Sequence, residues 1–213
     1  KVHTQYSICE GAIKIDDLAN YCKTNKIKAI GLADSYNLCG ALEFAEKISK
    51  TGTQPIIGTQ INILSENQIG KITLYATSEQ GYKNLTKLSS KSYLNNKASH
   101  DPYCEISDLI LNNEDLILLT GNYKDFFGKL FYANKTKYFE QIIKRLRSSF
   151  KDRLYIEIQR HGEDQESNYE NYLLNVSSSY DLPIIAGQEV YYLDESMAEA
   201  HDALICIGNK EFI

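Results

Sequence analysis

Short apolar runs rich in β-branched residues recur along this chain of 213 residues and constrain its fold more than any other feature. Each run is bounded by polar residues, glycine or proline, which is typical of buried strands. Six strands are predicted in this way, at residues 29–33, 55–63, 72–76, 116–120, 154–158 and 182–186.

Segments with helical spacing of apolar residues lie between the predicted strands. Ile15, Leu18 and Cys22 recur at i, i+3 and i+7, and residues 139–146 show a similar spacing. Strands and helices that alternate this often favour right-handed βαβ units around a mostly parallel sheet. We therefore predict an α/β fold. Periodicity alone does not choose between an open sheet and a barrel, but the sequence lacks the glycine-rich phosphate loops of nucleotide-binding open sheets.

The composition restricts the partners and the compartment. Lys and Arg number 23 against 28 Asp and Glu, a net charge of −5, so we expect no general electrostatic attraction to nucleic acid. The five cysteines are scattered without a C-x-x-C pair, which indicates reduced thiols rather than disulfides or a zinc ribbon. No run approaches the roughly 18 to 20 apolar residues of a membrane span. We expect a single cytoplasmic domain over residues 1–213 with no membrane contact.

Polar side chains follow most of the predicted strands, at the edge where the loops of an α/β fold meet. Four of them have metal-ligand chemistry: His3, Asp34, His161 and Glu189. These four could converge on one metal ion in principle. A cluster of two or three divalent metals for phosphoester hydrolysis needs more ligands than a chain with four histidines readily supplies.

Each candidate ligand also has a simpler interpretation. Asp34 suits a turn, where its side-chain oxygens accept backbone bonds. His161 is equally suited to a turn, and His3 to a hydrogen-bonded position in the core. The remaining histidines are weaker candidates, because His100 falls in a polar tract at 95–103 that we expect to be a surface loop and His201 falls in a predicted C-terminal helix.

One predicted helix carries several basic residues. Such charges form a solvated face more often than they contact a phosphate backbone. The residues are Lys137, Lys144, Arg145 and Arg147.

Several sequence blocks resemble the PHP (polymerase and histidinol phosphatase) domain of bacterial DNA polymerase III alpha subunits. The first is Val2-His3-Thr4-Gln5-Tyr6-Ser7, and the second runs from Gly31 to Gly40 through Ala33-Asp34-Ser35. Further blocks follow in the same order at 54–58, 81–85, 156–162, 182–186 and 199–204, so the resemblance covers essentially the whole chain.

The resemblance implies a distorted (β/α)7 barrel with mostly parallel strands, forming the N-terminal part of a much longer replicative polymerase chain. It also implies that nucleotidyl transfer with magnesium belongs to another domain of that chain. The implied partners are the rest of the polymerase, the proofreading exonuclease subunit, which would dock on this domain, and other replicase subunits. DNA would be contacted mainly through the full-length protein.

Family members with an intact metal site carry histidine or carboxylate ligands at positions where this sequence differs. The replacements are Lys1, Ser35, Gln60, Lys71 and Tyr191. We therefore expect neither a catalytic residue nor a metal in this domain. Because a protonated lysine supplies positive charge without binding metal, we hypothesise that Lys1 and Lys71 neutralise Asp34 and Glu189.

Three functions follow from this interpretation. The favoured one is a non-catalytic, structural domain of a DNA polymerase. The first alternative is a residual metal-dependent 3′–5′ exonuclease or phosphoesterase that uses His3, Asp34, His161 and Glu189. The second is a free-standing α/β enzyme acting on a small phosphorylated substrate, which would require an intact site.

Overall fold

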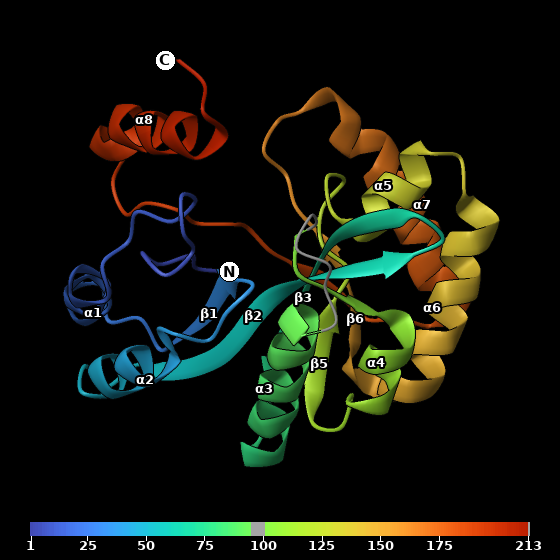
Figure 1. Cartoon of the computed structure of the whole chain (residues 1–213), viewed down its shortest axis with the longest axis horizontal. Helices are drawn as coiled ribbons and strands as arrows, with labels where there is room; N and C mark the ends of the chain where they lie inside the picture. Colours follow the sequence, from blue (N-terminus) through green and yellow to red (C-terminus); the bar gives the residue numbers. More distant parts are fainter. Residues whose placement is uncertain (95–100, 213) are drawn as a thin grey trace. The chain divides into compact units, whose positions relative to one another are not determined.

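The computed structural model describes residues 1–94 and 101–212 and divides into two compact units. The first unit comprises Lys1–Thr59 and Glu189–Ile213, and the second comprises Gln60–Gln188 (Figure 1). Residues 95–100, which include His100 and most of the expected surface loop, lie outside the described residues.

The first unit contains helices α1 (Ile15–Thr24), α2 (Ala41–Ser49) and α8 (Ala198–Asn209), the turn η2 (Glu195–Met197), strand β1 (Ala29–Ser35) and the start of strand β2 (Gln54–Ser65). The helical spacing near the start of the sequence is confirmed, because Ile15, Leu18 and Cys22 are buried against Phe44 and Ile48 of α2. These side chains form the core of the unit.

The N-terminal segment joins distant parts of the first unit. Val2 forms parallel bridges with both Leu32 of β1 and Val190, and Thr4 bridges to Ile13. The N-terminal segment is therefore held by single bridges and not by a regular strand. Its consequence is that residues from both ends of the sequence lie beside the carboxyl end of β1.

Helix α8 is apolar but not buried. Seven of its twelve residues are apolar, yet none is buried. The Nε2 atom of His201 lies 2.7 Å from the carbonyl oxygen of Glu10, and its ring packs against Tyr191 and Tyr192. His201 is thus a helix-packing residue.

The second unit holds the larger number of elements. They are β3 (Gln68–Ala76), α3 (Glu79–Leu94), β4 (Tyr103–Glu105), α4 (Ile106–Leu111), β5 (Leu116–Leu119), α5 (Phe126–Tyr132), α6 (Thr136–Phe150), η1 (Lys151–Arg153), β6 (Leu154–Ile158), α7 (Asp164–Tyr180) and β7 (Ile184–Ala186). Its strands follow the order β2-β3-β5-β6-β7, with β4 beside β2.

Strand β3 is the exception to the parallel arrangement. β4 pairs with β2, β5 with β6 and β6 with β7 in parallel, whereas β3 pairs with β5 antiparallel. The cause is local: only Glu66 and Asn67 connect β2 to β3, with φ of 45° and 64°, as a type I′ hairpin turn requires. A two-residue connection reverses the chain, whereas a parallel neighbour needs a longer crossover.

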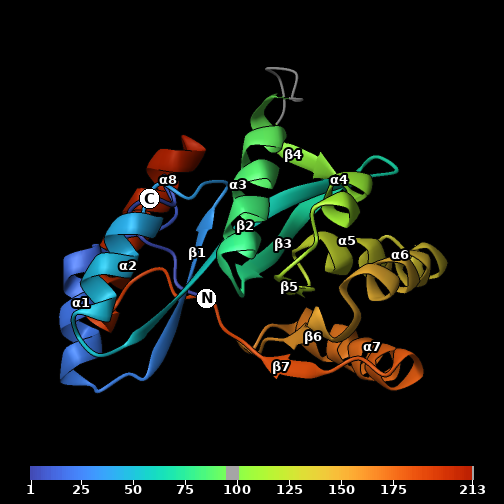
Figure 2. The same ribbon diagram turned by 90° about the horizontal axis from the view of Figure 1, so that it is seen from below.

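Helices α6 and α7 lie side by side next to β6 (Figure 2). The predicted spacing in α6 is confirmed, because Phe139, Ile142, Ile143 and Leu146 are all buried. The ring of Phe139 meets Tyr172 of α7 edge to face at 5.1 Å between centroids. None of the helices in the described residues has the length and apolar character needed to cross a bilayer.

Candidate functional site

A buried ion pair occupies two of the positions named above. The Nζ atom of Lys1 lies 2.9 Å from Oε1 of Glu189, and the two side chains are only 2% and 12% exposed. Tyr191 donates its hydroxyl to the other carboxylate oxygen at 2.7 Å. The Tyr191 ring stacks on His3, with centroids 4.4 Å apart and planes 15° apart. The sequence predicts nine site positions, four candidate ligands and five replacements. Four of these nine therefore form one contact group.

The charge of Glu189 is balanced inside the protein. Burial alone would raise the pKa of this carboxyl, because a low-dielectric environment disfavours its charged form. The charge and hydrogen bond of Lys1, together with His3 and Tyr191, outweigh burial and lower the pKa to about 2. Glu189 is therefore ionised at neutral pH, with an ammonium group as its counter-charge.

Asp34 lies fully buried at the carboxyl end of β1 and is surrounded by donors. Its Oδ1 accepts the Thr4 N–H at 2.6 Å and the Ser7 hydroxyl at 2.7 Å, while Oδ2 accepts the Thr4 hydroxyl at 2.8 Å. Burial raises the pKa of Asp34, although the bonds from Ser7 and Thr4 oppose this. Asp34 thus anchors the N-terminal segment rather than the turn that follows its strand.

Ser35 continues the same network. Its hydroxyl donates to Oε2 of Glu10 at 2.5 Å, and its N–H donates to the Ser7 oxygen at 3.1 Å. The Ser7 oxygen also lies 3.5 Å from Nδ1 of His3, which is fully buried. Hydroxyl groups therefore connect His3, Asp34 and Ser35, and the simpler interpretation of His3 as a core histidine agrees with these contacts.

The other three site positions belong to the second unit. Gln60 is fully buried on β2 and donates its amide to the Thr73 hydroxyl at 3.3 Å. Lys71 lies half-buried on β3, and its suggested role in neutralising carboxylates stays a prediction. His161 is exposed, and its N–H donates to the Glu166 carboxylate in the first turn of α7, as a turn residue would.

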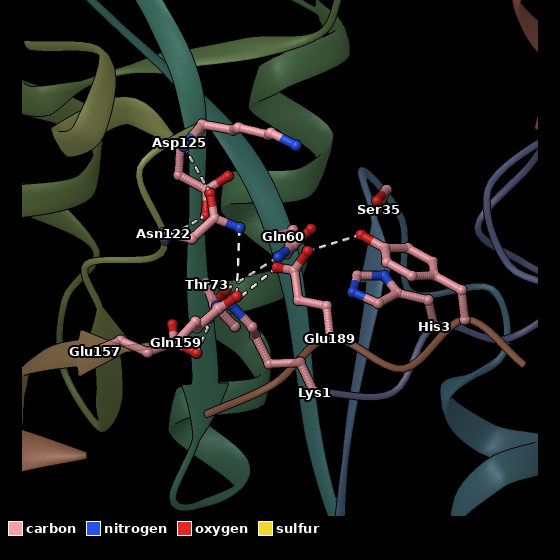
Figure 3. Close-up of polar contacts among 12 residues, drawn as sticks. Lys1, His3, Ser35, Gln60, Thr73, Asn122, Asp125, Glu157, Gln159 and Glu189 are labelled. Atoms are coloured by element: carbon pink, nitrogen blue, oxygen red, sulfur yellow. Dashed lines mark hydrogen bonds and ion pairs between the residues drawn. The ribbon is translucent and has the colours of Figure 1, made fainter. Parts of the chain in front are cut away.

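A second polar chain runs from the end of β6. His161 Nε2 lies 3.1 Å from Oε1 of Gln159, whose amide nitrogen donates to Glu157 at 2.9 Å. Because an amide oxygen only accepts, Nε2 of His161 carries the proton. Asn122 approaches the same Gln159 oxygen at 3.4 Å (Figure 3). Glu157 was missed from the sequence, although a lone carboxylate within the apolar run 154–158 was the available signal.

The residues present do not fit the cluster of divalent metals expected in family members with an intact site. Asp34 already accepts three hydrogen bonds, and an ammonium group occupies the coordination side of Glu189. Within residues 1–94 and 101–212, no group of three or more His, Cys, Asp or Glu side chains is placed to hold one metal ion.

Similarity to solved structures extends over most of the fold. One is described as a metal-dependent phosphoesterase from Bifidobacterium adolescentis, with a TM-score of 0.56, 11% identity and 95% coverage of each chain. Another is an amidohydrolase from Chromobacterium violaceum, with a TM-score of 0.54 and 10% identity. At such identities the likeness concerns the fold alone, and it confirms the predicted class, an α/β fold of the distorted-barrel type.

Curated relatives match the chain along its length. DNA polymerase III subunit alpha of Caulobacter vibrioides is 35% identical over 221 residues, which is all of this chain and 19% of that protein. The corresponding subunits of Vibrio cholerae and Rickettsia bellii are 32% and 35% identical, over 97% and 98% of this chain. The chain thus spans less than a fifth of the length of these relatives. The PHP domain family matches residues 1–161. With more than half of its residues matched, the chain belongs to the PHP domain family.

Proposed function

We propose that this chain is one PHP domain, the N-terminal part of a bacterial replicative DNA polymerase, in which internal polar contacts replace the hydrolytic metal site. The 29–35% identity to polymerase III alpha subunits over nearly the whole chain supports the polymerase assignment. The observation that carries the loss of hydrolysis is the buried pair of Lys1 and Glu189.

An ammonium group replaces only part of what a metal does. It balances the carboxylate charge and holds Glu189 in place. A hydrolytic metal also keeps an open position and lowers the pKa of the water bound there, so that a hydroxide is available at neutral pH. Lysine offers neither property, so the pair preserves the structure of the pocket without a nucleophile.

The contacts of Asp34 support the same proposal. Thr4 and Ser7 supply three donors to its carboxylate, which satisfies a buried charge without a cation. Ser35 faces Glu10 through its hydroxyl instead of offering a ligand nitrogen. The first unit is therefore stabilised by hydroxyl and ammonium groups at the positions where relatives with intact sites use ligands.

A metal-binding and hydrolysis experiment tests the proposal. The purified chain is dialysed against manganese or zinc and the bound metal is counted; it is then incubated with 3′-labelled single-stranded DNA and with p-nitrophenyl phosphate. We expect no stoichiometric metal and the same background turnover as the Asp34→Ala, His161→Ala double variant. Two bound metals, or turnover clearly above the double variant, would establish the residual exonuclease or phosphoesterase instead.

The activity of the whole polymerase belongs to parts of the chain beyond this domain in our proposal. Template-directed nucleotidyl transfer with magnesium would take place in a separate domain, in the cytoplasm, together with the other replicase subunits. We expect no DNA synthesis by the 213 residues alone. A primer-extension assay with magnesium and all four deoxynucleotides checks this, with the full-length subunit as the positive control.

The domain also serves as a contact surface in this proposal. Helix α8 has seven apolar residues and none buried, and Ile8 and Ile207 of the first unit are 74% and 72% exposed. We assign this surface to packing against the rest of the polymerase chain, and we expect the proofreading exonuclease subunit to dock elsewhere on the domain. Co-purification of the full-length polymerase with that subunit, compared with a version lacking residues 1–213, tests the docking role.

A further inference from the structure

A hollow of about 830 Å³ opens at the end of the second unit where β6 begins. It lies between the last turns of α6, the turn η1 and the end of α7. The side chains that line the hollow include Lys144, Arg147, Ser148, Lys151, Tyr155 and Tyr180. The hollow is separate from Gln159 and His161, which follow the opposite end of β6.

The cations of the hollow share one face of α6. Lys144, Arg147 and Lys151 are spaced by three and four residues, which places them one above another along a helix and its cap. The opposing acids are Asp152 and Asp181. Arg147 and Asp181 are 3.7 Å apart, and Asp181 is fully exposed, so this pair is loose and readily exchanged for a stronger anion.

Aromatic rings lie beside these cations. Tyr155 and Tyr180 are both half-buried, and Tyr180 is fixed by donating its hydroxyl to Glu140 at 2.7 Å. Lys144 Nζ lies 5.6 Å from the centre of the Tyr180 ring. Aromatic rings next to positive charges match single-stranded nucleic acid, whose bases stack on aromatic faces while its phosphates contact Lys and Arg.

Lys151 has an unfavourable backbone conformation for a lysine. It follows α6 with φ 55° and ψ −117°, a region that glycine adopts without steric cost and other residues avoid. Lysine is kept at a position where glycine would relieve the backbone strain. This points to a role for the lysine side chain. In this case the side chain lines the hollow.

We propose that this hollow binds the phosphate backbone of single-stranded DNA, with Tyr155 and Tyr180 contacting bases. The relatives that match this chain are DNA polymerase subunits, so single-stranded DNA would be present where the domain acts. The hollow is distinct from the pair of Lys1 and Glu189, and the proposal does not depend on whether that site binds metal. With three cations and a net chain charge of −5, the binding is weak and strongly dependent on salt.

The experiment measures fluorescence anisotropy of a labelled oligo-dT with the purified 213-residue chain from 20 to about 200 mM salt. Three phosphate contacts on a single strand predict a slope of about −2 for log K against log salt. We expect Arg147→Glu with Lys151→Glu to weaken binding at least about 10-fold. The matched control, Lys87→Glu with Arg145→Glu, changes the net charge equally at exposed positions outside the hollow and retains most of the affinity.

Lys151→Gly gives the sharpest outcome. Relief of the positive φ raises the urea midpoint, while the loss of the ammonium group lowers the affinity for oligo-dT. Tyr155→Ala weakens binding between about 5-fold and 100-fold, whereas Tyr180→Phe, which keeps its ring, changes little. The proposal is overturned if oligo-dT does not bind at low salt, if the control variant loses as much affinity as the hollow variant, or if polyglutamate binds equally well.

Discussion

The substitution Lys1→Met removes the charge that balances Glu189 and keeps most of the apolar stem of the side chain. The carboxylate it leaves behind is only 12% exposed, so water replaces little of the lost interaction. The pKa of Glu189 falls from 4.5 to about 2 in the folded chain. At about 1.4 kcal/mol for each pKa unit, this depression corresponds to about 3 kcal/mol, similar to the cost of breaking other buried pairs. We expect the free energy of unfolding at pH 7 to fall by about 3 kcal/mol.

Urea unfolding with linear extrapolation measures the loss. Lys28→Met provides the matched control, because Lys28 is an exposed lysine of the same unit. The double variant Lys1→Met, Glu189→Gln buries no charge and should recover most of the stability, to within about 1 kcal/mol of the native chain. The cost of Lys1→Met should also be smaller at pH 4 than at pH 7, since a protonated Glu189 needs no counter-charge.

Equal effects of Lys1→Met and Lys28→Met would refute the reasoning. So would a double variant that is less stable than Lys1→Met alone, because the cost would then arise from packing and not from an isolated buried carboxylate. Addition of manganese to Lys1→Met distinguishes one further case: a large recovery of stability would mean that the remaining residues still form a metal site.

Three more outcomes follow from the contacts of the first unit. Asp34→Ala leaves three buried donors without an acceptor and should destabilise the chain by about 3 kcal/mol in urea, whereas Asp34→Asn keeps one oxygen for two of them and should cost less than half as much. Gly11→Ala would place a methyl group 2.1 Å from the carbonyl oxygen of Thr4, so we expect a loss of about 1–3 kcal/mol and a lower melting temperature by calorimetry. The depressed pKa of Glu189 gives stability that is present above its unfolded value of 4.5 and is lost as the pH falls toward about 2. Because Glu189→Gln removes this contribution, unfolding curves at pH 5 and pH 3 should show a smaller loss of stability for the variant than for the native chain. The raised pKa of Asp34 acts in the opposite direction, but equally in both proteins.

Local pattern was sufficient for most of the elements. The six apolar runs became β1, β2, β3, β5, β6 and β7, and the apolar spacing in α1 and α6 matched their buried faces. Strand β4, of three residues, was missed because it is too short to show a period and lies at the end of a polar tract. The reversal of β3 was missed because Glu66 and Asn67 are not the glycine-containing pair that usually indicates a two-residue hairpin.

The sequence by itself determined the family and the α/β class, and it predicted nine positions where ligand chemistry is kept or lost, since these depend on residue types in a given order. Only the tertiary structure decided which residues satisfy one another. Lys1 pairs with Glu189 and not with Asp34, whose carboxylate is served by Thr4 and Ser7. The reason is a long-range contact that no local pattern encodes: Val2 bridges both β1 and Val190, which brings the first residue of the chain to Glu189.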